Sequence, residues 1–227
     1  MTRPVQLSRA HRRSPRSRPP IREGGATDEF PGLGRVEQLV LRGDGLTTTS
    51  LEILTGDTIT VEVAGHWSLA IPGSDDLFLA SSLHYDADRS STGDYVATAH
   101  RHLAMMVGET LLVREVLLVG TDGTVHGSAE VLARLGGIPQ PVAEALASTD
   151  QPIGRLLRDH GVQVTRELCT WGLIPAGSRA ARLGPQLTPA SRVPGRTYVM
   201  RLTATKTPLA VLTERFAPHV FEGEAGG

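Results

Sequence analysis

The feature that most constrains the fold is a β-hairpin predicted in the middle of the chain. Residues 111–119 and 125–132 are rich in leucine and valine, and the turn between them contains Asp122-Gly123. An Asp-Gly pair supplies the positive backbone angles that a tight hairpin turn needs. Further strands are predicted over residues 57–67, 162–173, 197–205 and 209–216. Strands that follow one another through short connections predict antiparallel pairing.

Short helical segments interrupt these strands. Helices are predicted from apolar spacing over residues 36–41, 51–54, 141–147 and 153–160. Residues 71–94 are predicted to be irregular with a short helix over 77–83, and residues 175–196 are predicted to form a loop. Antiparallel strands interrupted by paired short helices predict an α+β domain with a single meandering sheet.

Composition excludes several classes of protein. The 23 basic and 24 acidic side chains leave a net charge of -1, so no bulk polyanion partner such as nucleic acid is implied. The apolar runs are far shorter than the roughly 18 to 20 residues needed to cross a bilayer. The single cysteine, Cys169, cannot form an internal disulfide. Arg12-Arg13 is not followed by the apolar region of an export signal, so we expect a cytoplasmic protein with no membrane partner.

The N-terminal segment differs from the rest of the chain. Residues 1–23 contain seven arginines, four prolines and one acidic residue, a composition typical of disorder. We therefore expect a tail over residues 1–30, a domain over 31–221 and a flexible C-terminus over 222–227. A basic arm that touches nucleic acid or anionic lipid and a leader without function are both open interpretations of the tail.

Two predicted strands carry a charge on an apolar face. Glu214 shares its face with Leu212 and Phe216, and Arg114 shares its face with Leu112 and Val116. A buried charge is costly unless it is paired, so each residue needs a partner, which is either the other residue or a ligand. A structural salt bridge, or a strand buried on its opposite face, is the alternative interpretation.

Other chemical motifs are weak. His100 and His102 have the spacing of two ligands on one strand face, but no third ligand follows at a recognisable distance. Cys169 is expected to be a small core residue. The glycines at 43, 45, 136 and 137 are expected to lie in turns, and none begins a phosphate-binding motif. The sequence therefore predicts no metal site and no cofactor.

Several short motifs together resemble the chorismate lyase (chorismate pyruvate-lyase) family. They occur in the order found in that family, at Leu112–Leu118, Asp122-Gly123, Gln151–Leu157, Thr165–Glu167, Arg196–Tyr198 and Leu212–Pro218. The turn at residues 44–48, followed by Leu51-Glu52, is similar to a helical flap of the same family. The resemblance covers about residues 34–219. It implies a sheet with short helical flaps that enclose a buried pocket.

The resemblance also implies roles for individual residues. Arg114 would bind the ring carboxylate of the substrate, and Glu214 would face the ring hydroxyl as the second catalytic residue. The backbone amide of Ile153, and a second amide at Leu46 or Thr47, would help to hold the carboxylate. Such a site needs only to position and polarise chorismate, because loss of a ring proton and of the enolpyruvyl group yields an aromatic ring without a cofactor.

Two further residues belong to the expected substrate-binding set. Arg166 lies in one of the shared motifs. Glu130 stands where the family usually carries an arginine for the second carboxylate of the substrate, although a shift of four residues places Arg134 there instead. A glutamate at that position would repel a dianion, so the substrate could be a monoanion or a relative of chorismate.

Three functions follow from these observations. The first is a lyase that converts chorismate to 4-hydroxybenzoate and pyruvate, for a quinone or secondary-metabolite pathway, as a monomer. The second is a non-catalytic sensor of aromatic acids, since a related fold serves as the effector domain of transcription regulators. The third is a divergent enzyme that acts on another enolpyruvyl or aromatic acid. Residues 1–33 are too short and too rich in proline for a DNA-binding helix-turn-helix domain.

Overall fold

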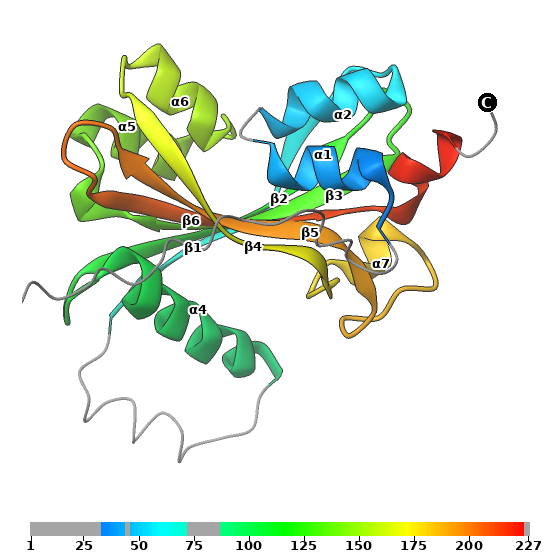
Figure 1. The fold of residues 1–227 in the computed structure, drawn as a ribbon. Helices are drawn as coiled ribbons and strands as arrows, with labels where there is room; N and C mark the ends of the chain where they lie inside the picture. The colour runs from blue at the N-terminus through cyan, green and yellow to red at the C-terminus, as the bar shows by residue number, and fades with distance from the viewer. Residues whose placement is uncertain (1–32, 44–45, 72–86, 225–227) are drawn as a thin grey trace, which may run out of the picture.

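The computed structural model describes residues 33–43, 46–71 and 87–224 (Figure 1). The tail expected over residues 1–30 and the helix expected over 77–83 lie outside the described residues. Within the described ranges, no helix is both long enough and apolar enough to span a membrane.

In the described part of the chain, six antiparallel strands form one sheet in the order β1-β2-β3-β6-β5-β4. Their bounds are Thr60–Ala70 for β1, Thr110–Val119 for β2, Val125–Arg134 for β3, Val164–Pro175 for β4, Arg192–Leu202 for β5 and Pro208–Phe216 for β6. β3 and β6 lie at the centre of the sheet, and β1 and β4 form its edges. The predicted α+β class with a single antiparallel sheet is confirmed.

The predicted hairpin is confirmed as β2 and β3. Gly123 has a φ of +84°, which a residue without a Cβ adopts at little cost. The Asp122 carboxylate accepts a hydrogen bond of 2.8 Å from the backbone N–H of Thr124. The Asp57 carboxylate accepts another of 2.8 Å from the backbone N–H of Thr121. Asp57 therefore supports this turn, and β1 begins at Thr60 rather than at Asp57.

Helices cover both faces of the sheet. α1 (Arg35–Arg42), α2 (Thr47–Thr55), α5 (Gln140–Ser148) and α6 (Ile153–Asp159) lie on one face, which we call the paired-helix face (Figure 1). α4 (Ala87–Leu103) lies on the opposite face. The remaining short helices among the described residues are η1 (Leu135–Gly137), α7 (Ala180–Leu183) and η2 (Pro218–Glu224). On the paired-helix face, α1 and α2 cover one end of the sheet and α5 and α6 cover the other.

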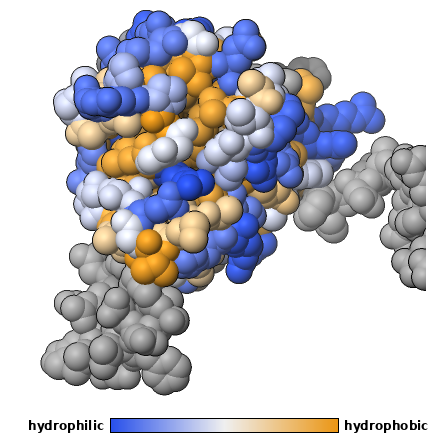
Figure 2. Space-filling view, turned by 90° about the vertical axis from the view of Figure 1, so that its left-hand side faces the viewer, coloured by the Kyte–Doolittle hydropathy of each residue, from blue (hydrophilic) through white to orange (hydrophobic). Residues whose placement is uncertain are grey.

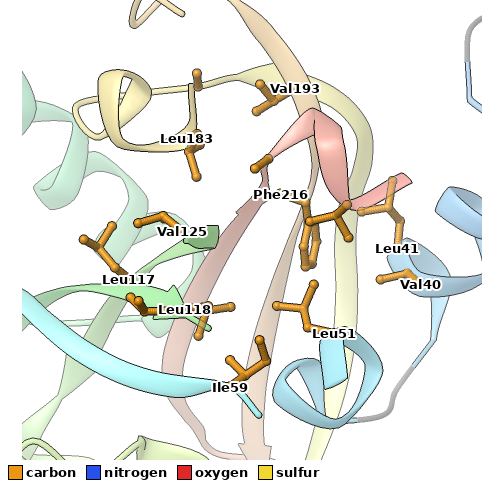
Figure 3. Packing of buried hydrophobic residues seen from close by; sticks show 14 of the residues in the cluster. Val40, Leu41, Leu51, Ile59, Leu117, Leu118, Val125, Leu183, Val193 and Phe216 are labelled. Carbon is orange, nitrogen blue, oxygen red and sulfur yellow. The ribbon is translucent and has the colours of Figure 1, made fainter. Parts of the chain in front are cut away.

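Each helix pair is held by apolar packing. Leu41 of α1 and Leu51 of α2 are fully buried beside Phe216 of β6 (Figure 3). At the other end, Leu146 of α5 and Leu156 of α6 pack in a cluster that includes strand residues of β2, β3, β5 and β6. Full burial of one leucine side chain contributes about 1.5–3 kcal/mol. The two pairs are therefore anchored independently at opposite ends of one face.

α4 was not predicted, and its presence corrects the assignment of two histidines. His100 and His102 lie in the last turn of this helix and not on a strand face. Tyr95, Ala99 and Leu103 of α4 pack against the sheet. The helix escaped prediction because its sequence contains only a few large apolar residues among many Ser, Thr, Asp and Gly residues, which are poor formers of helix interiors.

β5 begins five residues earlier than the predicted strand, at Arg192. Pro194 and Gly195 interrupt the apparent strand pattern, because proline cannot donate to a ladder and glycine is rare within strands. Gly195 is required here for space: a Cβ at this position would lie 2.6 Å from the carbonyl oxygen of Glu214. The segment predicted as a loop therefore contains the first half of β5, together with α7.

Candidate ligand-binding site

Arg114 is a buried cation on the paired-helix face. It projects from β2 and is 1% exposed. Its Nη1 and Nη2 atoms donate to the carbonyl oxygens of Gln151 (2.9 Å) and Thr149 (2.8 Å) in the connection between α5 and α6. Among the described residues, none accepts a hydrogen bond from its Nε, and no carboxylate forms an ion pair with it. Burial lowers the pKa of Arg114, although the charge of Asp150 opposes this effect.

Glu214 is a buried anion whose carboxylate accepts three hydrogen bonds. It is 4% exposed in β6. Its Oε2 accepts from the Arg196 Nε at 2.7 Å, and its Oε1 accepts from the Thr47 hydroxyl at 2.6 Å and from the Tyr198 hydroxyl at 2.9 Å. The Oε1 atom has two lone pairs in the carboxylate plane, and both are engaged. Glu214 thus links β6 and β5 to the first residue of α2.

Arg114 and Glu214 share a face but not a hydrogen bond. Arg114 is opposite Val131 of β3, and Val131 is opposite Leu212 of β6, two residues before Glu214. Side chains two residues apart on a strand point to the same side of the sheet. The sequence predicted correctly that both charges are buried. Their protein partners, however, are Arg196 for Glu214 and backbone carbonyls for Arg114.

Arg196 and Tyr198 complete the polar centre of this face. Arg196 is 3% exposed, and its guanidinium lies 5.4 Å from the centre of the Tyr198 ring. Burial, followed by the nearby charge of Glu214, raises the pKa of Tyr198 well above its ordinary value. Tyr198 is therefore a hydrogen-bond donor to Glu214 over the whole physiological pH range. Neither residue was among the predicted site residues, although both lie in a motif used for the family resemblance.

Arg166 lies beside a pocket on the same face. Its guanidinium is 5.8 Å from the centre of the Tyr198 ring. The pocket has a volume of about 240 Å³ and lies where α6 meets β4 and β5. Arg166, Arg158 and Gln163 supply its polar lining, and the other lining residues are Gly154, Leu157, Gly161, Val162, Val164 and Met200. Seen from the side on which α5 and α6 lie, the surface shows a band of apolar residues between hydrophilic ones (Figure 2).

Three residues were expected to contact the ligand through a backbone amide or a helical flap. All three lie on the paired-helix face. Ile153 is the first residue of α6 and is 5% exposed. It follows Gln151, whose carbonyl oxygen Arg114 binds, by two residues. Thr47 is the first residue of α2 and contacts Glu214 directly. Leu46 precedes it and is 40% exposed. The structure therefore brings Arg114, Ile153, Thr47 and Glu214 to the sheet surface between the helix pairs.

Glu130 does not belong to this site. It is opposite Glu115 of β2, one residue away from Arg114, so its side chain projects to the α4 face. There it lines a cavity of about 10 Å³ with Glu115 and Arg179. Burial is the main cause of the raised pKa of Glu130. The expected repulsion between Glu130 and a bound anion is therefore wrong. Arg134, the alternative at this position, pairs with Glu109 at 2.6 Å.

The charge balance of the site favours an anionic ligand. Arg114, Arg166 and Arg196 lie on the paired-helix face, and Glu214 is the buried carboxylate that faces them. Because Arg196 neutralises Glu214, Arg114 is the buried arginine of this face that forms no ion pair with a carboxylate among the described residues. A carboxylate is the planar group that a guanidinium binds most specifically. Within the described residues, no group of three or more His, Cys, Asp and Glu side chains could hold a metal ion.

Comparison with known proteins identifies the fold. No family model and no curated protein matches the sequence. The effector domain of PhnF from Mycobacterium smegmatis superimposes with a TM-score of 0.52 at 14% identity, over 78% of this chain and 91% of that domain. A GntR-family transcriptional regulator from Bacillus cereus gives a TM-score of 0.47 at 12% identity, over 73% of this chain and 96% of the other. The chain has the α+β fold shared by GntR-family effector domains and chorismate lyase.

Proposed function

We propose that this protein is a small-molecule-binding domain that recognises the carboxylate of an aromatic acid and does not catalyse its formation. The observation that carries the proposal is the Nε of Arg114, a buried donor without a hydrogen-bond partner in the described part of the chain. An unsatisfied buried donor costs about 1–3 kcal/mol, and more when it is charged. A ligand carboxylate at Arg114 would remove this cost and supply the missing counter-charge.

The partners of Glu214 support binding over catalysis. A general base must reach the proton that it removes and must be free to accept it. Glu214 already accepts three hydrogen bonds, one of them from a buried guanidinium. Only one of the roughly four lone-pair sites of its carboxylate, on Oε2, is therefore left for a substrate. As a fixed anion, by contrast, it can orient Tyr198 and Thr47 around a ligand without transferring a proton.

The structural neighbour supports the same function. The PhnF structure is that of its effector domain, and this chain shares the fold of that domain. We extend the binding of an effector to this protein on the basis of its buried arginine and the buried polar residues of the paired-helix face.

Chorismate cleavage is the second candidate function. It is favoured by the order of the six motifs and by the location of Arg114 and Glu214 on one sheet face, as the resemblance implies for a lyase. In this case the enzyme would hold the ring carboxylate at Arg114 and release 4-hydroxybenzoate and pyruvate. Glu214 would then act through the remaining lone pair of Oε2 or release one of its partners during each turnover.

Calorimetric titration tests the proposed binding directly. The two ligands are 4-hydroxybenzoate and its neutral isostere 4-hydroxybenzamide. Because a charge-assisted hydrogen bond contributes about 1.5–3 kcal/mol, we expect the acid to bind about 10- to 150-fold more tightly than the amide. Equal affinity for the two compounds would contradict a carboxylate site at Arg114.

A further inference from the structure

The guanidinium of Arg196 joins four structural elements. Its Nε donates to Glu214 of β6, and its Nη2 donates to the Thr47 hydroxyl of α2 at 3.0 Å. Its Nη1 donates to the carbonyl oxygens of Val40 (2.8 Å) and Gly43 (2.6 Å) at the end of α1. Four of its five N–H groups are therefore engaged while the side chain is 3% exposed.

These contacts satisfy groups that α1 and α2 cannot satisfy themselves. The last carbonyl oxygens of an α-helix have no donor within the helix, and the helix dipole makes its C-terminal end negative. Arg196 supplies both the donors and the positive charge at the end of α1. It also holds the first residue of α2, so one planar group fixes the junction of the two helices.

The same guanidinium orients Glu214. Arg196 binds Oε2, while Thr47 and Tyr198 bind Oε1. Because Thr47 contacts both Arg196 and Glu214, the hairpin formed by α1 and α2 cannot move away from the sheet without breaking this network. A change at Glu214 must likewise alter the support of the hairpin.

We propose that Arg196 is a positioning residue that couples the α1–α2 hairpin to the ligand site, so that the hairpin and the Glu214 carboxylate respond to a ligand as one unit. This inference rests on the proposed function only for the identity of the ligand. Arg196 touches no ligand atom in this scheme and acts through Thr47 and Glu214. Release of the hairpin uncovers Glu214 and opens the path by which the ligand enters and leaves.

The test compares Arg196→Lys and Thr47→Val with two matched controls. Lysine keeps the charge, but its single nitrogen cannot span both helix ends and Glu214. The control for Arg196 is Arg201→Lys, because Arg201 is also in β5 and its contact with Glu167 is exposed. The control for Thr47→Val is Thr47→Ser, which retains the hydroxyl.

Two measurements are made on the full chain. Hydrogen exchange is followed in residues 35–43 and 46–55, with β6 as the internal reference. The dissociation rate of 4-hydroxybenzoate is followed by stopped flow. In both test variants we expect exchange of the hairpin and dissociation of the ligand to become about 10- to 150-fold faster, with β6 unchanged and both controls like wild type.

Three results would overturn the inference: hairpin exchange like that of wild type, an equal increase in the hairpin and in β6, or an unchanged dissociation rate. An equal increase would mean that Arg196 stabilises the fold as a whole. If wild type does not bind 4-hydroxybenzoate, the proposed ligand is wrong. The exchange of the unliganded variants then still decides whether Arg196 holds the hairpin.

Discussion

At the scale of single residues, the paired-helix face is defined by how its charges are compensated. Glu214 and Arg196 neutralise each other at 2.7 Å and are both nearly inaccessible to solvent. Arg114 is equally buried but is held only by backbone carbonyls. Because removal of a charge from water is costly, this asymmetry identifies Arg114 as the residue that gains most from an external anion.

Substitution of Arg114 should weaken recognition of a carboxylate. We expect Arg114→Ala to weaken the binding of 4-hydroxybenzoate by about 10- to 150-fold, because a charge-assisted hydrogen bond is lost. The control is Arg134→Ala, which removes an arginine paired with Glu109 away from the site. Calorimetry checks both variants. An equal loss of affinity in the two variants would mean that Arg114 contributes only general positive charge.

Glu214 should be more important for stability than a surface carboxylate. Glu214→Gln leaves the Arg196 charge buried without a counter-ion, and we expect the free energy of unfolding to fall by about 3–5 kcal/mol. Glu167→Gln breaks the exposed pair with Arg201 and should cost less than about 1 kcal/mol. Urea denaturation measures both values. A Glu214 variant as stable as wild type would refute the structural role assigned to this ion pair.

At the scale of secondary-structure elements, the sequence predicted best where local chemistry and periodicity agree. The β2–β3 hairpin was predicted because the Asp122-Gly123 turn lies between two apolar runs. β6 was predicted from the apolar run over residues 209–212, and the two-residue period of a strand placed Glu214 on the same face as Leu212 and Phe216. The strand period thus identified a site residue within a predicted element.

Elements with weak periodicity were missed, and with them the partner of Glu214. Arg196 follows Pro194 and Gly195, so the start of β5 had no visible alternation in which a buried arginine would stand out. The face on which Glu130 lies could not be predicted either, since an apolar strand buried on both sides does not reveal which of its faces carries the site. Only the register with β2 resolves that question.

The contact between β3 and η2 should respond to pH. His219 Nε2 lies 3.2 Å from His126 Nδ1. Burial lowers the pKa of His126 from its ordinary 6.5, and the neighbouring His219 lowers it further, while Asp57 and Asp122 oppose the effect. Below about pH 6.5 the unfolded chain therefore binds a proton that the folded chain does not bind, and the free energy of unfolding decreases as the pH falls.

Urea denaturation between pH 7.5 and pH 5.5, roughly one unit to each side of that pKa, tests this expectation. We expect His126→Gln to lose less stability than wild type over this interval, because the titrating group is absent. His66→Gln, on the edge strand β1, serves as the control and should follow wild type. If the His126 variant keeps the full pH dependence, another group is responsible for it.

At the scale of the whole molecule, one sheet separates two polar regions with different roles. On the α4 face, Glu115 accepts hydrogen bonds from Arg179, Ser178 and Tyr95, so its charge is compensated within the protein. On the paired-helix face, Arg114 has no such ion pair within the described residues. The fold is shared with the effector domain of PhnF, and this difference between the two faces is the reason why we propose the ligand site on the paired-helix face.

We propose that the paired-helix face binds an aromatic carboxylate and that the protein does not turn over chorismate. The most direct measurement mixes the purified protein with chorismate and follows 4-hydroxybenzoate by chromatography and pyruvate by a coupled assay, with binding of 4-hydroxybenzoate recorded on the same sample by calorimetry. We expect binding of 4-hydroxybenzoate and no release of pyruvate above the uncatalysed rate. Formation of 4-hydroxybenzoate and pyruvate in equal amounts would contradict it and would establish the protein as a chorismate lyase.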